Sequence, residues 1–123
     1  MKFLTVDDAK VIRMMLENVV KRYIKHATML QAEHGADGMK VLEEHPDVKM
    51  IFIDWNMPIM NGYEFVKAVR ANDAYKEIKL IMVTTEGERE KVAEAAKAGI
   101  NGYVVKPFNQ EILEKVIKKY FDV

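Results

Sequence analysis

The stretch Met50-Ile51-Phe52-Ile53-Asp54 decides the fold, because four consecutive apolar residues run directly into a carboxylate. An apolar run of strand length without alternation is typical of a strand that is covered on both faces of a parallel sheet. The run Leu80-Ile81-Met82-Val83, which ends at Thr84, has the same pattern. Three more short apolar runs lie at residues 3–6, 27–32 and 103–105. The sequence therefore predicts five strands.

Segments with apolar residues at helical spacing lie between these runs and after the last one. The clearest are the first, with Val11, Ile12, Met15, Val19 and Tyr23, and the last, with Ile112, Leu113, Val116, Ile117 and Tyr120. The other helices are expected over residues 36–44, 62–71 and 88–98. Five alternations of strand and helix predict right-handed crossovers and a three-layer α/β sandwich. The nine methionines, with the Met14-Met15 pair among them, are expected to fill the core.

The amino-acid composition excludes several classes of function. The 123 residues match one domain, and 19 basic against 19 acidic residues give no reason to expect a nucleic acid or an anionic membrane as partner. Cysteine and serine are both absent, which excludes disulfides, thiolate metal sites and cysteine or serine nucleophiles. Neither a signal peptide nor a membrane-spanning run is present in the sequence, so we expect a cytoplasmic protein.

Polar residues follow four of the predicted strands. Asp7-Asp8 follows the first strand, Asp54 the third, Thr84-Thr85 the fourth and Lys106-Pro107 the fifth. Ligands of open α/β sheets bind beyond the carboxyl ends of the strands. We therefore expect three carboxylates, a hydroxyl and an ammonium group at one edge of the sheet.

These residue types favour phosphoryl chemistry. Three close aspartates repel one another unless a cation neutralises them, and oxygen-only ligands favour Mg²⁺. Lys106 and the Thr84 hydroxyl are suited to bind two phosphoryl oxygens, and Asp54, which lies between them and the acidic pair, is the expected nucleophile. In-line phosphoryl transfer needs positioning and charge neutralisation more than a proton-transfer base.

Each of these residues also has an ordinary structural interpretation. Asp8 is suited to cap a helix, Asp54 to open a turn, and Thr84 or Thr85 to cap the helix that follows. Only their joint placement after the right strands favours a functional site. The histidines His26, His34 and His45 have no metal-ligand spacing and are expected at the surface.

The sequence resembles the receiver domains of response regulators, and within them the single-domain chemotaxis regulators, over essentially its whole length. The resemblance rests on Val6-Asp7-Asp8, residues 53–58 with Asn61-Gly62, residues 82–86 and residues 102–108. It implies a flavodoxin-like fold with five helices and a five-stranded parallel sheet in the order 2-1-3-4-5. It also implies one receiver domain over residues 1–123 with no output domain, which is expected to be a monomer.

The resemblance assigns roles to these residues. Asp7, Asp8, Asp54 and the backbone carbonyl of Asn56 would hold Mg²⁺, and Asp54 would accept a phosphoryl group from a histidine kinase. Thr84 and Tyr103 would form the switch pair, and the Lys106–Pro107 peptide bond would be cis. The protein would catalyse only its own phosphorylation and dephosphorylation.

The resemblance also implies an output surface on the fourth helix, fifth strand and fifth helix, which would bind a partner such as a flagellar motor switch protein. This surface is expected to comprise Arg89, Val92, Ala96, Tyr103, Lys115 and Lys119. Two positions depart from the commonest pattern of the family, Ala9 in place of serine and Thr85 in place of alanine. Thr85 adds bulk beside the pocket, which leaves the packing around Tyr103 open.

Three alternatives remain. A phosphatase of the haloacid-dehalogenase type also uses an aspartate nucleophile with Mg²⁺, but it needs a second aspartate as general acid where this chain has Asn56. A flavodoxin-like electron carrier would place the FMN phosphate beside Asp7 and Asp8, which would repel it. A stand-alone receiver in a phosphorelay unrelated to chemotaxis fits the same residues.

Overall fold

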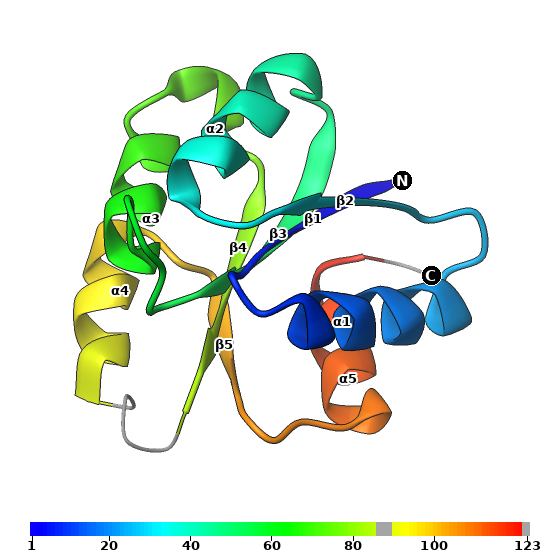
Figure 1. The fold of residues 1–123 in the computed structure, drawn as a ribbon. Helices are drawn as coiled ribbons and strands as arrows, with labels where there is room; N and C mark the ends of the chain where they lie inside the picture. The colour runs from blue at the N-terminus through cyan, green and yellow to red at the C-terminus, as the bar shows by residue number, and fades with distance from the viewer. Residues whose placement is uncertain (86–89, 122–123) are drawn as a thin grey trace.

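The architecture is a parallel five-stranded sheet in the order β2-β1-β3-β4-β5, as predicted (Figure 1). It is seen in a computed structural model, which describes residues 1–85 and 90–121. The strands are β1 (Lys2–Val6), β2 (Thr28–Ala32), β3 (Val48–Asp54), β4 (Lys79–Thr84) and β5 (Gly102–Val105). The strand order reverses beside β1, since β2 and β3 lie on either side of it, and this reversal is where open α/β sheets bind ligands.

In the described residues, α1 to α4 and a short 3₁₀ turn lie between successive strands, and α5 follows the last strand. Helices α1 and α5 cover one face of the sheet, and α2, α3 and α4 cover the other (Figure 1). Their bounds are α1 (Lys10–Tyr23), α2 (Gly35–Glu44), α3 (Gly62–Arg70), the turn η1 (Asp73–Tyr75), α4 (Val92–Ala98) and α5 (Gln110–Tyr120). The three layers of the predicted sandwich are therefore confirmed.

The consecutive apolar residues of β3 are buried on both faces. Ile51 and Ile53 pack into the cluster under α2, α3 and α4, whereas Met50 and Phe52 pack into the cluster under α1 and α5. Side chains alternate between the two faces of a strand, so a central strand with a helical layer on each side has no position open to water. The absence of alternation in residues 50–53 is thus explained by packing.

The apolar stripe predicted for α1 is only partly right, because Ile12, Val19 and Tyr23 of that stripe do pack against the core. Helix α1 buries Leu16 and Val20, while Val11 and Met15, which were expected on the inner face, are 68% and 42% exposed. Met14 is exposed as well, so the Met14-Met15 pair does not fill the core. The segment carries two adjacent apolar stripes, and helical periodicity alone does not select between them.

Of the three histidines expected at the surface, His26 is exposed, whereas His34 and His45 are partly buried. His34 caps α2 by accepting a hydrogen bond from the Asp37 backbone N–H, and His45 lies 3.1 Å from the Lys2 ammonium. Helix α4 covers the second part of the helix expected over residues 88–98, and Arg89 lies outside the described residues. Within the described chain no helix is long and apolar enough to cross a membrane.

Candidate phosphorylation site

The strand register brings the predicted site residues together. In the sheet Val6 of β1 lies beside Ile53 of β3, and Asp54 lies beside Val83 of β4. Asp7, which follows β1, is therefore next to Asp54, and Thr84 at the end of β4 is next on the other side. The edge of the sheet predicted from the strand ends is thus present in the fold.

Three carboxylates form a cluster at this edge. One oxygen from each of Asp7, Asp8 and Asp54 lies within 4.8 Å of the others. Asp7 and Asp54 are buried, whereas Asp8 is exposed, so the cluster opens to solvent on the Asp8 side. Carboxylates at this separation are close enough to share one divalent cation.

Lys106 places a positive charge directly beside two carboxylates of this cluster. Its ammonium nitrogen lies 3.3 Å from Asp54 Oδ1 and 3.7 Å from Asp7 Oδ2. The Lys106–Pro107 peptide bond is cis, as expected. The Lys106 backbone N–H donates to the carbonyl of Thr84 at 2.6 Å, so the lysine and the threonine are held side by side across β4 and β5.

Burial shifts the titration of the two buried carboxyls. Burial, with a smaller contribution from the charge of Asp7, raises the pKa of Asp54 to about 6, although Lys106 opposes the shift. Burial also raises the pKa of Asp7, against the hydrogen bond that it accepts from the Ala9 N–H. One lysine therefore does not compensate the charge of the cluster, and a divalent cation would do so.

Two buried side-chain oxygens at this edge have no hydrogen-bond partner among the described residues. They are Asp7 Oδ2 and Thr84 Oγ1. Buried polar atoms are nearly always paired, so unpaired ones at a candidate site point to a ligand that pairs them. An oxygen-only ligand set that includes a free carboxylate oxygen suits Mg²⁺, and a free hydroxyl beside it suits a phosphoryl oxygen.

The backbone after Asp54 is held by the start of α3. The Gly62 N–H donates to the Trp55 carbonyl at 2.9 Å, and a β-carbon on Gly62 would collide with the Asp54 carbonyl. Glycine at this position therefore permits the close approach of helix and strand. Asn61 and Glu64 close a capping box that fixes where the helix begins.

The remaining predicted residues lie as follows. Asn56 is exposed two residues beyond Asp54, and Thr85 is exposed beside the buried Thr84. Tyr103 is 40% exposed on β5, so it belongs to the outer surface and not to the cluster.

Sequence reasoning missed Arg13, a buried residue that donates a hydrogen bond to the Asp7 carbonyl. The signal was available, because Arg13 shares a helical stripe with Leu16 and Val20.

Comparison with known proteins defines the class. The family model of the response regulator receiver domain matches residues 3–118, which is most of the chain. The chain therefore belongs to the response regulator receiver family. Receiver domains of this kind are signalling proteins and not classical enzymes, which removes the phosphatase and the electron carrier from the alternatives.

The more specific likeness is to chemotaxis regulators. A "Chemotaxis protein CheY homolog" of Campylobacter jejuni is 45% identical over 118 residues, which cover 96% of this chain and 90% of that protein. "Chemotaxis protein CheY1" of Helicobacter pylori strain J99 is 43% identical, over 96% of this chain and 94% of that protein. The solved structure of CheY4 of Vibrio cholerae superposes with a TM-score of 0.87 at 36% identity, with 98% of each chain covered. This chain is thus a receiver domain of the CheY type.

Proposed function

We propose that this protein is a cytoplasmic, phosphorylation-activated chemotaxis regulator that accepts a phosphoryl group on Asp54 from a histidine kinase. The observation that carries the proposal is the acidic cluster of Asp7, Asp8 and Asp54, with the Lys106 ammonium 3.3 Å from Asp54. These groups combine a nucleophile, a cation-binding set and a fixed positive charge at one edge of the sheet. They are the groups that phosphoryl transfer to a carboxylate requires.

In the proposed reaction an Asp54 carboxylate oxygen attacks phosphorus, the bond from phosphorus to the histidine nitrogen breaks, and the histidine leaves with its electron pair. The product is an acyl phosphate, which water hydrolyses back to Asp54 and inorganic phosphate. Lys106 would bind one phosphoryl oxygen and the Thr84 hydroxyl another, since both lie beside Asp54. The unpaired Thr84 Oγ1 supports this role.

Asp7, Asp8, Asp54 and the Asn56 carbonyl would hold Mg²⁺, as the resemblance implies. A bound Mg²⁺ neutralises the carboxylates and the developing charge on the phosphoryl oxygens. The unpaired Asp7 Oδ2 is the described atom that most needs such a partner. The exposed Asp8 provides the side from which an ion and a phosphodonor would enter.

The proposed signal passes from Thr84 to the surface of α4, β5 and α5. A phosphoryl group adds about −1.5 to −2 charges and should draw the Thr84 hydroxyl toward it. That movement would leave space beneath α4 for the ring of Tyr103, which is now 40% exposed. Lys91, the residue that precedes α4, already contacts the site region, because its ammonium lies 5.5 Å from the centre of the Trp55 ring, and Trp55 follows Asp54.

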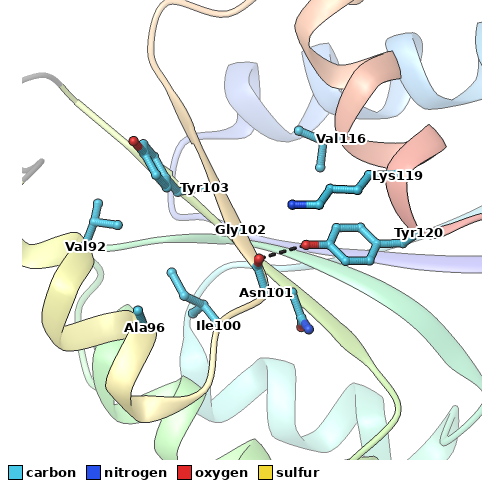
Figure 2. A pocket seen from close by; sticks show the side chains of 9 residues that line it. All are labelled: Val92, Ala96, Ile100, Asn101, Gly102, Tyr103, Val116, Lys119 and Tyr120. Atoms are coloured by element: carbon cyan, nitrogen blue, oxygen red, sulfur yellow. Dashed lines mark hydrogen bonds between the residues drawn. The ribbon is translucent and has the colours of Figure 1, made fainter.

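The proposed output surface surrounds a cavity of about 380 Å³ between α4, β5 and α5 (Figure 2). Its lining includes Val92, Ala96, Tyr103 and Lys119, four of the residues proposed for this surface. Lys115 lies on the exposed side of α5, 3.7 Å from Glu111. An apolar cavity with a lysine at its rim suits a short amphipathic, acidic helix, such as a segment of a motor switch protein.

The phosphorylation proposal is tested with acetyl phosphate and mass spectrometry. In Mg²⁺ we expect wild type to gain one phosphoryl group and Asp54→Asn to gain none, because the amide does not form an acyl phosphate. The matched control is Asp47→Asn, which removes the same charge from an exposed aspartate paired with Lys2. Phosphorylation of Asp54→Asn at the wild-type rate, or its loss in Asp47→Asn, would contradict the assignment.

The output proposal is tested by adding an acidic amphipathic peptide to the protein with and without beryllofluoride and Mg²⁺. We expect tighter binding to the activated form, with amide shifts at Val92, Ala96 and Tyr103. Equal affinity in both states, or shifts confined to α1 and α2, would disprove the proposed switch.

A further inference from the structure

Arg13 places a guanidinium group inside the protein. It is only 7% exposed and lies on the buried side of α1 with Leu16 and Val20. Burying a charged group is costly unless it is fully hydrogen-bonded, and arginine is almost never buried without partners. The contacts of Arg13 therefore indicate what its burial achieves.

Those contacts lead to the acidic cluster. Arg13 Nη1 donates to the Asp7 carbonyl at 2.6 Å, and Arg13 Nε donates to the Gln31 side-chain carbonyl on β2 at 3.0 Å. Gln31 in turn donates to Glu17 at 2.7 Å, and Glu17 is paired with Lys21 at 2.8 Å. This chain of hydrogen bonds fixes the guanidinium between α1, β2 and the backbone of Asp7.

Asp7 is held at every polar atom except one. Its N–H donates to Ala32 at 3.1 Å, its carbonyl accepts from Arg13, and its Oδ1 accepts from the Ala9 N–H at 2.8 Å. Only Oδ2 has no hydrogen bond among the described residues, and it faces Lys106 at 3.7 Å. Arg13 thus fixes the peptide plane between Asp7 and Asp8, on which the direction of both carboxylates depends.

From this arrangement we infer that Arg13 is a positioning residue for the cation site. Its hydrogen bonds go to the Asp7 carbonyl and the Gln31 side chain, so it would act on the ion through the Asp7–Asp8 backbone, which it holds so that both carboxylates point at the same place. The inference rests on the proposed Mg²⁺ site. Loss of a group that orients metal ligands typically weakens metal affinity by about 10–100-fold.

The experiment follows Mg²⁺ binding through the fluorescence of Trp55, which is the single tryptophan and adjoins Asp54. We expect Arg13→Gln to weaken Mg²⁺ binding by about tenfold, and Arg13→Lys, which keeps the charge but loses one of two bonds, by a smaller factor. At saturating Mg²⁺, the rate of phosphorylation by acetyl phosphate should return to near the wild-type value, because Arg13 acts on ion binding and not on the transferred group.

Two control variants separate positioning from general damage to α1. Arg22→Gln removes the same charge from an exposed position of the helix, and Val20→Ala weakens its buried face without touching Asp7. Both should bind Mg²⁺ like wild type. Val20→Ala weakening the affinity as much as Arg13→Gln would overturn the inference, and so would wild-type affinity in Arg13→Gln.

A further variant covers the case in which Arg13→Gln does not fold. Gln31→Leu leaves the guanidinium in place but removes its second partner, so Mg²⁺ affinity should fall by a smaller factor, and an unchanged affinity would overturn the inference. The two hypotheses are distinguishable. Wild type that shows no response to Mg²⁺ would remove the proposed site itself, whereas a normal wild type with an unchanged Arg13→Gln would remove only the role of Arg13.

Discussion

The two ends of the sheet differ in how completely their polar groups are paired. At the carboxyl end, Asp7 Oδ2 and Thr84 Oγ1 are buried without a hydrogen-bond partner in the described part of the chain, and two buried carboxyls contact the same lysine. At the amino end, Arg70 of α3 donates to the carbonyls of Gly99 and Ile78 at 2.9 and 2.8 Å. Among the described residues, the first end therefore leaves buried polar oxygens unpaired, whereas Arg70 at the second end donates to backbone carbonyls of the protein itself.

The amino end is a connected network. Arg70 Nη2 also donates to the Asn101 side-chain carbonyl at 2.9 Å, which accepts from the Leu80 N–H at 2.8 Å as well. The Tyr120 hydroxyl donates to the Asn101 backbone carbonyl at 2.8 Å (Figure 2). One arginine thus joins α3 to the end of α4 and the starts of β4 and β5. The Arg70 network and the proposed ligand site therefore lie at opposite ends of the same strands.

The largest effect on stability is expected at the amino end. Arg70→Met should lower the free energy of unfolding by about 3 kcal/mol, because several carbonyl groups lose a charged donor. Urea denaturation measures this change. Lys67→Met is the matched control on α3, since Lys67 is exposed, its ammonium lies 5.3 Å from the centre of the Tyr63 ring, and its loss should cost below about 1 kcal/mol. Equal losses in the two variants would contradict the comparison.

At the carboxyl end, removing a charged side chain is expected to raise the free energy of unfolding instead of lowering it. The pKa of Asp54 is about 6 in the folded protein and near its ordinary value of 3.8 when unfolded. Between these values the folded state binds more protons, so stability without metal should fall as the pH rises through this window. At about 1.36 kcal/mol per pKa unit the loss is at most about 3 kcal/mol.

The variant Asp54→Asn tests whether the Asp54 carboxylate destabilises the metal-free protein. At neutral pH without metal the variant should be more stable than wild type by about 2 kcal/mol, less than the full value because the amide gives up the ion pair with Lys106. The two proteins should converge below the unfolded pKa, where Asp54 is protonated in both states. Denaturation across the pH range measures the difference. Mg²⁺ should stabilise wild type more than the variant, and a variant less stable at neutral pH would show the prediction to be wrong.

How much of this was predictable from the sequence differs between the two ends. The carboxyl end was foreseen because each of its residues ends a strand or directly follows one, and the parallel strands of one sheet bring such positions to a single edge. The Asp7, Asp54, Thr84 and Lys106 side chains were therefore predictable from local patterns. The network at the amino end was not, because Arg70 and Asn101 meet only through packing between segments that are distant in the chain.

Helix α1 is a second case in which the sequence pattern predicts an element but not how it packs. Its existence followed from periodicity, but the choice between its two apolar stripes did not. The structure buries the stripe that contains Arg13, and the hydrogen bonds of Arg13 to Asp7 and Gln31 help to fix this rotation. A charged residue in an apolar stripe was a usable signal, but the sequence does not show that Arg13 bonds to the Asp7 backbone carbonyl and to Gln31 of β2.

The smallest effect is expected at Ile59, beside the carboxyl end. Its φ is +69°, it is 79% exposed, and the turn around it is closed by a 2.7 Å hydrogen bond from the Met60 N–H to the Pro58 carbonyl. A β-branched residue at positive φ in so tight a turn is strained. Met60 holds the turn, because it packs against Gly35 and its carbonyl accepts from the Gly35 N–H at 3.3 Å.

Ile59→Asn should therefore raise the free energy of unfolding by about 1 kcal/mol, because asparagine adopts positive φ more readily and the exposed isoleucine gives up little burial. The same substitution at Ile112, which is 40% exposed in the first turn of α5, is the control. Ile112 has an ordinary helical backbone, so Ile112→Asn should lower stability. Urea denaturation of both variants measures the two signs. A loss of stability in Ile59→Asn would mean that this turn carries no strain. The unfavourable features of the carboxyl end would then be its unpaired oxygens and its close carboxylates alone.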